Sequence, residues 1–167
     1  AIFAMKYTEG MNVDNSTDHW YVHDNRVYRY WTDQGMQFNG NYNLIENNEI
    51  YKVTDVVNRP FGCGMVNFMG NNNILRGNKM SRLGSTADCW GFGFEWNLAD
   101  ANLVEDNYIW DVTNGFGIHG GDGNIIRDNT IIAAPGWNYP GGYVESHDNR
   151  LDWPCDDRPG TGSPSNV

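Results

Sequence analysis

The residue types that can do chemistry gather in the third quarter of the chain. Asp88, Glu95, His119 and Asp122 combine three carboxyl groups with one imidazole. Two carboxyl groups about 5–9 Å apart suffice for glycosidic hydrolysis, with one as the acid and the other as the base or nucleophile. A carboxylate beside a histidine stabilises the protonated ring and orients it for proton transfer. These four residues are therefore the candidate catalytic groups, if the fold brings them together.

A second set of residues is suited to binding sugars. Exposed aromatic side chains stack on the apolar faces of sugar rings and also anchor protein interfaces. Trp90, Trp96 and Trp137 fall in expected loops or near the ends of expected strands. They are the candidate sugar platforms, and the alternative is that they only cover the apolar flank of the fold.

Composition and charge exclude several classes of protein. The chain of 167 residues has 11 Lys+Arg against 21 Asp+Glu, and this net charge of −10 argues against a nucleic-acid binder. With 40% apolar and 14% aromatic residues it is too apolar for a disordered chain. No apolar run approaches the ~18 residues of a membrane span. No basic and then apolar leader opens the chain, so a secreted protein would be a mature form or an excised piece.

The elements that must position these residues follow from an internal repeat. Four seven-residue segments superpose without gaps, at 44–50, 74–80, 103–109 and 125–131, and weaker copies stand at 21–27 and 145–151. The residue that all copies share is an asparagine, namely Asn25, Asn48, Asn78, Asn107, Asn129 and Asn149. A period in the twenties with short β segments predicts a solenoid of about six coils. We expect these asparagines to stack in single file and to occupy the left-handed turn position.

A glycine opens a short strand after each of the first five copies, at 35–38, 64–67, 93–96, 117–120 and 142–144. Aligning these glycines predicts one outward column, made of Gln37, Val66, Glu95 and His119. Adjacent coils would then bring Glu95 and His119 within roughly 5 Å of each other.

Charged residues test the alignment of the repeat. The position two residues before the shared asparagine reads His23, Glu46, Arg76, Glu105, Arg127 and His147. The four central residues alternate in sign, and opposite charges on neighbouring strands stabilise a sheet by ~0.2–1 kcal/mol per pair. Chance is the alternative explanation. Two adjacent apolar columns, which begin at Leu44 and Ile45, predict that only one of them points inward.

The motif Asn-[Leu/Ile]-[Ile/Leu/Val]-x-x-Asn-x-[Ile/Met] resembles the repeat of right-handed parallel β-helix proteins of the pectate-lyase-like superfamily, over roughly residues 11–153. The resemblance implies an all-β, single-domain, right-handed parallel β-helix, with the domain at 1–153 and a Pro/Gly-rich tail at 154–167. Members of that family are mostly secreted and mostly act on polysaccharides, and they include tailspikes, adhesins and surface-layer modules. No N-terminal helix cap is evident, which predicts a fragment of a longer chain or a subunit with covered ends.

The resemblance suggests two kinds of chemistry. The stretch Ile118-His119-Gly120-Gly121, one coil after Asp88, is similar to the polygalacturonase pattern, although one Asp stands where that family has two. Lys52 and Arg82 would be neighbours, and a Lys base beside an Arg that neutralises a uronate is the lyase chemistry of such proteins. A plain surface Glu–His pair, and basic residues that merely counter Asp111, are the alternatives. The charge of −10 opposes a polyanionic substrate.

The cysteines and turns bear on compartment and cofactors. Cys63 and Cys89 lie on consecutive long loops and are candidates for a disulfide, which would suit an extracellular or cell-surface protein, and Cys155 lies in the tail. No Cys/His set has zinc spacing. Turns rich in Asp and Asn offer the oxygen ligands that Ca²⁺ takes, but no calcium-loop spacing occurs. We therefore expect no cofactor, with Ca²⁺ as the one ion that the turns would suit.

Two function classes stay open. The first is a secreted module that binds a polysaccharide and, as an enzyme, would cleave it as a glycoside hydrolase or lyase, in a groove beside the long loops at 54–63 and 84–91. The second is a non-catalytic module of an extracellular filament, surface layer or adhesin that assembles through its uncapped coil ends. Clustered aromatics and uneven loops favour the first class. Short length, missing caps and an extended tail favour the second.

Overall fold

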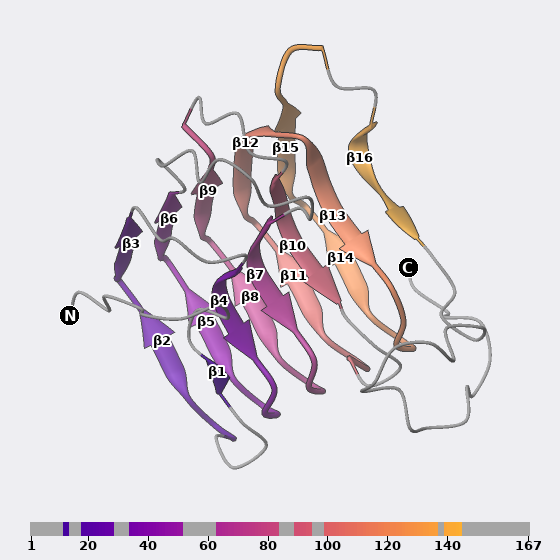
Figure 1. The fold of residues 1–167 in the computed structure, drawn as a ribbon. Helices are drawn as coiled ribbons and strands as arrows, with labels where there is room; N and C mark the ends of the chain where they lie inside the picture. The colour runs from indigo at the N-terminus through magenta and orange to yellow at the C-terminus, as the bar shows by residue number, and fades with distance from the viewer. Residues whose placement is uncertain are drawn as a thin grey trace.

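In the computed structural model, residues 12–13, 18–28, 34–51, 63–83, 89–94, 99–136 and 139–144 are described, and all of their regular structure is β-strand (Figure 1). The strands are short and follow one another in a repeating order. They are β1 (Asn12–Val13), β2 (Tyr21–His23), β3 (Arg26–Tyr28), β4 (Gln34–Phe38), β5 (Leu44–Glu46), β6 (Glu49–Tyr51), β7 (Cys63–Phe68), β8 (Ile74–Arg76), β9 (Lys79–Ser81), β10 (Cys89–Phe94), β11 (Leu103–Glu105), β12 (Tyr108–Val112), β13 (Asn114–Ile118), β14 (Ile125–Arg127), β15 (Thr130–Ala133) and β16 (Tyr139–Val144).

Every third strand enters the same parallel sheet, which is the topology of a solenoid (Figure 1). Sheet A has the order β1-β4-β7-β10-β13-β16, sheet B the order β14-β11-β8-β5-β2, and sheet C the order β15-β12-β9-β6-β3. The predicted all-β, parallel β-helix fold is confirmed. The coil count is lower than the expected six, because the consecutive triplets from β2 to β16 make five complete coils and β1 is a single strand of an earlier one.

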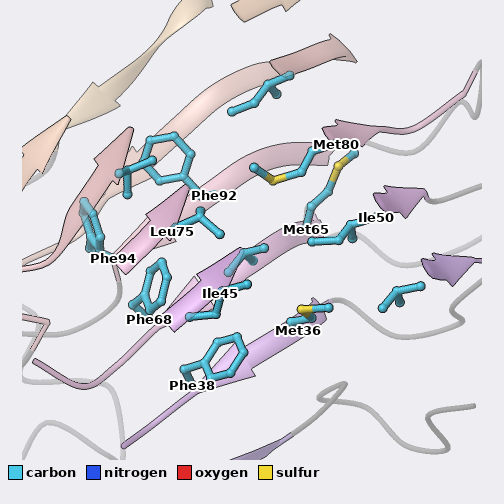
Figure 2. Close-up of a cluster of buried hydrophobic side chains, with 14 of the residues drawn as sticks. Met36, Phe38, Ile45, Ile50, Met65, Phe68, Leu75, Met80, Phe92 and Phe94 are labelled. Atoms are coloured by element: carbon cyan, nitrogen blue, oxygen red, sulfur yellow. The ribbon is translucent and has the colours of Figure 1, made fainter. Parts of the chain in front are cut away.

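The core lies between the three sheets and is filled by apolar columns (Figure 2). Phe38, Phe68 and Phe94 of sheet A stack with ring centroids 5.9 and 5.8 Å apart. Figure 2 also shows Met65 beside Met80 and Ile50 of sheet C. Full burial of these large side chains supplies the main stabilisation of the coils.

The shared asparagines do stack in single file, at the corner between sheets B and C. The Oδ1 atom of Asn78 accepts the backbone N–H of Asn48 at 2.8 Å and its Nδ2 at 3.0 Å. The Nδ2 atom of Asn78 donates to the carbonyl oxygens of Ile45 and Arg76. The same side-chain bonds continue through the ladder along Asn25, Asn48, Asn78, Asn107 and Asn129. This confirms the predicted column as far as Asn129, and Asn149 lies outside the described residues.

The residue before each shared asparagine, and not the asparagine itself, adopts the left-handed turn conformation. The prediction that the asparagine would occupy this position is wrong. The residues with positive φ are Asp24, Asn47, Gly77, Asp106 and Asp128. The physical reason is that the shared side chain must turn inward to reach the ladder. The residue before it reverses the chain at the surface, where glycine or a short polar side chain tolerates positive φ.

A second asparagine ladder builds the corner between sheets A and B. Its asparagines are the first residue of the repeat motif, for which sequence reasoning predicted no role. The backbone N–H of Asn43 donates to Oδ1 of Asn73 at 2.9 Å, and the pattern repeats from Asn73 to Asn102 and from Asn102 to Asn124. Here too the preceding residue has positive φ, as at Tyr42. Two corners of each coil therefore use the same local chemistry.

The charged column is confirmed. Glu46, Arg76, Glu105 and Arg127 are consecutive lateral neighbours in sheet B. The Nη2 atom of Arg76 lies 3.1 Å from Oε2 of Glu46, and that of Arg127 lies 2.6 Å from Oε2 of Glu105. The Ile45 column points inward and is buried, whereas Leu44 and its neighbours form an outward, half-exposed column.

The predicted register of sheet A is partly wrong. The observed outward column joins Gln37 and Asn67 to Gly93 and Gly117, whereas Val66 pairs with Phe92 in the buried core. Of the aligned glycines, Gly93 and Gly117 are equivalent, whereas Gly64 pairs with Gln34 and Trp90. Stacking of the core phenylalanines sets the register, and glycines on strands that follow loops of unequal length need not share a column.

Candidate functional site

The predicted catalytic face is the outward side of sheet A, where β10 and β13 end. His119 follows β13, and its backbone N–H donates to the carbonyl oxygen of Phe94 at 2.9 Å. Its ring meets the ring of Trp90 edge to face, with centroids 5.0 Å apart and an interplanar angle of 84°. The structure thus brings together one predicted catalytic residue and one predicted sugar platform.

The surroundings of His119 are tightly filled. Only 9% of His119 is exposed, so the imidazole is buried rather than presented on an open surface. Gly93 and Gly117 are lateral neighbours on this face, and a Cβ atom added at Gly93 would lie 2.5 Å from Oδ1 of Asn67. Asn67 is fully buried, and neither of its side-chain polar atoms has a hydrogen-bond partner in the described structure. The described residues on this part of the face are thus buried and line no open groove.

The other predicted catalytic residues are only partly described. Glu95 and Asp88 lie outside the described residues, and the register of β10 and β13 ends at Phe94 and Ile118. The Glu95–His119 pair therefore stays a prediction. Asp122 is exposed at the corner between sheets A and B, where its backbone N–H donates to Oδ1 of Asp100 at 2.7 Å.

The predicted substrate-binding residues are also only partly described. Trp96, Trp137 and Lys52 lie outside the described residues. Arg82 is buried, and its Nε atom lies 3.4 Å from Oδ1 of Asp111, next to an irregularity in β12. This contact matches the alternative in which Arg82 counters Asp111, and its part in a lyase reaction stays a prediction.

The outward face of sheet C carries an aromatic surface that sequence reasoning missed. We call Tyr28, Tyr51, Tyr108 and Trp110 the aromatic strip. Tyr28 and Tyr51 are neighbours in sheet C and share their column with Trp110, and Tyr108 stands one column away. Tyr28 is 46% exposed and Tyr108 is 43% exposed, whereas Trp110 is half-buried and Tyr51 is buried, with 7% exposed. Four rings from three coils therefore share one face of the solenoid.

Contacts between the rings hold the strip in place. Tyr51 and Trp110 meet at 5.6 Å and 70°, because the residue between them in the column is the small, buried Ser81. Trp110 lies against Tyr108 with centroids 5.2 Å apart. The rings are thus fixed before any ligand arrives, which lowers the entropy lost on binding.

Arg26 contacts the strip at its Tyr28 end. Its guanidinium carbon lies 5.1 Å from the ring centroid of Tyr28 and 5.5 Å from that of Tyr51, and its Nε atom lies 3.4 Å from Oε2 of Glu49. Burial, and then the charge of Glu49, raises the pKa of the Tyr51 phenol. Tyr51 is therefore a neutral hydrogen-bonding ring at physiological pH.

A signal for the strip was present in the repeat. The position three residues after the shared asparagine reads Tyr28, Tyr51, Ser81, Trp110 and Ile132, and these residues form one column. Sequence reasoning examined the next position instead, which holds Lys52 and Arg82, and looked for aromatics in loops.

Metal and disulfide chemistry can be assessed from the described ranges. No group of three or more His, Cys, Asp or Glu side chains there is arranged to hold a metal ion. No helix in those ranges is long and apolar enough to cross a membrane. Cys89 is disulfide-bonded, and its Cα partner in the register of β7 and β10 is Cys63. Strands in direct register bring Cα atoms within the span of a disulfide. The register is compatible with the predicted Cys63–Cys89 bridge, and that pairing stays a prediction.

Comparison with known proteins adds the family. A family model described as a right-handed β-helix region matches residues 9–150. The chain belongs to the right-handed β-helix family. A search of the curated proteins gave no match. This β-helix thus has the handedness expected from its repeat, and its membership agrees with the predicted pectate-lyase-like superfamily.

Proposed function

We propose that this β-helix is a secreted, polysaccharide-binding module and that the aromatic strip is its sugar-binding surface. The observation that carries the proposal is the set of four packed rings on one outward face of sheet C. Ring faces of this kind stack on sugar rings. Glu49 and Lys79, in the adjacent column, supply hydrogen-bonding groups for hydroxyls. The disulfide-bonded Cys89 supports an oxidising compartment.

Glycan-array binding followed by calorimetry on the best glycan tests the proposal. Tyr108→Ala should weaken binding by about tenfold, the worth of one well-placed ring contact. Tyr42→Ala is the matched control, because Tyr42 is at least as exposed as Tyr108 but stands at the corner between sheets A and B. Unchanged affinity in Tyr108→Ala, or no bound glycan at all, would refute the proposal.

Cleavage of the glycan would take place on the outward face of sheet A, away from the aromatic strip on sheet C. In this part of the proposal Glu95 exchanges a proton with the glycosidic oxygen or water, and His119, which is buried against Trp90, is a positioning residue that does not touch the sugar. Support comes from the Trp90–His119 contact beside the end of β13. Release of reducing ends from the bound glycan, abolished in Glu95→Gln with binding retained, is the expected result. Equal release by Glu95→Gln would remove Glu95 from the reaction.

A structural module is the second candidate, and one observation favours it. Ile126 and Ile131 are only partly buried, whereas their column mates Val104 and Ile109 are fully buried. Among the described strands, none pairs with the outer edge of β14 or β15. A strand edge that no described strand covers, beside partly buried core residues, is a site for adding another coil.

Head-to-tail stacking, however, needs two open ends. At the other end of sheets B and C, Val22 and Val27 are buried. We therefore expect sedimentation to show a monomer from micromolar to near-millimolar concentration. Concentration-dependent association, lost when Ile131 is changed to Asp while the fold is retained, would favour the structural module instead.

A further inference from the structure

We infer that the ligand is a neutral, β-linked glycan that runs along the solenoid axis, with about one sugar ring over each coil of sheet C; this rests on the proposed function. Neighbouring strands of a sheet stand about 4.8 Å apart. The five strands from β3 to β15 thus offer a track about 19 Å long, which is four strand spacings. A chain laid along it meets equivalent positions at regular intervals.

Two parallel columns give this track its repeating chemistry. The first is mostly aromatic or apolar and reads Tyr28, Tyr51, Ser81, Trp110 and Ile132. The second is mostly polar and reads Arg26, Glu49, Lys79, Tyr108 and Thr130. Tyr28 and Ile132 of the first column are exposed and Trp110 is half-buried, whereas Tyr51 is 7% exposed and Ser81 is fully buried. The first, fourth and fifth coils therefore present an apolar face to a sugar ring, and the polar column runs beside them. An extended β-linked chain is itself periodic, with flat rings and hydroxyls along its edges, so its repeat suits that of the coils. An α-linked chain that curls would leave the track.

The charges on this face favour a neutral chain. Arg26 is engaged by Glu49 and by two tyrosine rings, and Arg82 is buried against Asp111. Among the described residues of the two columns, Lys79 is the exposed cation without an ion pair. A polyuronate carries one carboxylate on every ring and would need a cation at most coils. The net charge of −10 would also repel it.

Three oligosaccharide series test the ligand class in the full chain. Cello-oligosaccharides of one to seven rings should bind more tightly with each added ring, up to about five rings, and then level off. The same oligosaccharides oxidised at C6 to uronates keep the linkage and length, and they should bind at least tenfold more weakly. Malto-oligosaccharides keep the neutral charge but change the linkage, and they should also bind at least tenfold more weakly.

Variants at opposite ends of the track test its direction. Tyr28→Ala and Trp110→Ala lie on β3 and β12. If the glycan follows the axis, Tyr28→Ala should weaken binding of the five-ring oligosaccharide by several-fold and leave binding of the two-ring oligosaccharide unchanged. Trp110→Ala should weaken both, because Trp110 packs against two other rings of the strip. Tyr42→Ala, outside the strip, should change neither.

The outcomes separate this inference from the proposed function. If a glycan binds and Tyr108→Ala weakens it, the sugar-binding function stands. Affinity that does not rise beyond two rings, or equal or tighter binding of uronates or of malto-oligosaccharides, then overturns only the axial, neutral, β-linked ligand. Binding of no glycan in any series overturns both.

Discussion

At the scale of single residues, an asparagine at each of two corners supplies the hydrogen bonds that a buried backbone corner needs. The side chain of Asn78 accepts two N–H groups of Asn48 and donates to two carbonyl oxygens. Three of these four hydrogen bonds are buried and the bond to Arg76 is part-buried. A buried polar group without a partner destabilises a protein by about 1–3 kcal/mol. The ladder is thus a requirement of the corner, which explains why the asparagine recurs while its neighbours vary.

The substitution Asn78→Leu should lower the free energy of unfolding by about 3 kcal/mol, since it strands buried donors and acceptors on both sides. The same substitution at Asn67 is the control. Asn67 is equally buried, but its amide has no partner in the described structure, so Asn67→Leu should be neutral or stabilising. Urea unfolding of both variants measures the contrast. Equal losses would show that the ladder bonds are not what distinguishes the two sites.

Ionisation of Tyr51 should make the stability of the folded protein depend on pH in the alkaline range. Burial and Glu49 raise the pKa of Tyr51, so the folded state disfavours its ionised form. In the unfolded chain a tyrosine ionises near pH 10. Stability is therefore fully present below about pH 10 and falls as the pH rises through this value. Tyr51→Phe should show a smaller loss than wild type between pH 8 and 11 in urea unfolding. Parallel pH curves for the two proteins would contradict this.

At the scale of elements, the sequence predicted the strand positions that the asparagine corners determine. It did not predict the register of sheet A, which core packing determines. The asparagine period marked the strands of sheets B and C, because each corner needs the same side chain at the same place. The alternating column from Glu46 to Arg127 followed directly from that period. Sheet A gave no such marker, because its strands follow loops of unequal length and its glycines do not share one column. Its register comes from stacked core rings, which only the folded structure displays.

The candidate site likewise has one part that depends on the folded register and one part that the repeat could have predicted. The contact between Trp90 and His119 joins residues 29 positions apart, and it depends on the register of β10 and β13 rather than on any local motif. The aromatic strip, in contrast, lies in one column of the repeat and was accessible from the alignment. The missing step was to ask which side chains follow the shared asparagine on the outward face.

Close contact between coils at the corner makes one glycine irreplaceable. A Cβ atom at Gly70 would overlap the backbone oxygen of Gly40, which cannot move without breaking the corner. Gly70→Ala should lower stability by about 3 kcal/mol or more. Gly123 has a φ of 66° but nothing within 4 Å of an added Cβ, so Gly123→Ala should lose only about 1 kcal/mol. Thermal unfolding ranks the two, and a larger loss at Gly123 would mean that backbone strain outweighs the close approach.

At the scale of the whole molecule, a solenoid is nearly one-dimensional, since each coil contacts only its neighbours and stability accumulates coil by coil. The described coils are not equivalent in this respect. Val22 and Val27 of the first coil are buried, whereas Ile126 and Ile131 of the last are partly exposed. Local stability should therefore decline toward β14 and β15.

Two isoleucines of one column test this gradient with a single substitution. Ile109 is fully buried between neighbouring coils, and Ile131, its partner in sheet C, is only partly buried. Ile109→Ala should lower the free energy of unfolding by about 2–5 kcal/mol. Ile131→Ala removes the same atoms but should lose less than half as much. In hydrogen exchange, amides of β14 and β15 should exchange before those of β11 and β12 in wild type, and Ile131→Ala should accelerate only the former. Equal losses, or uniform exchange along the chain, would mean that the last coil is held as firmly as the central ones and that the end of the solenoid is closed.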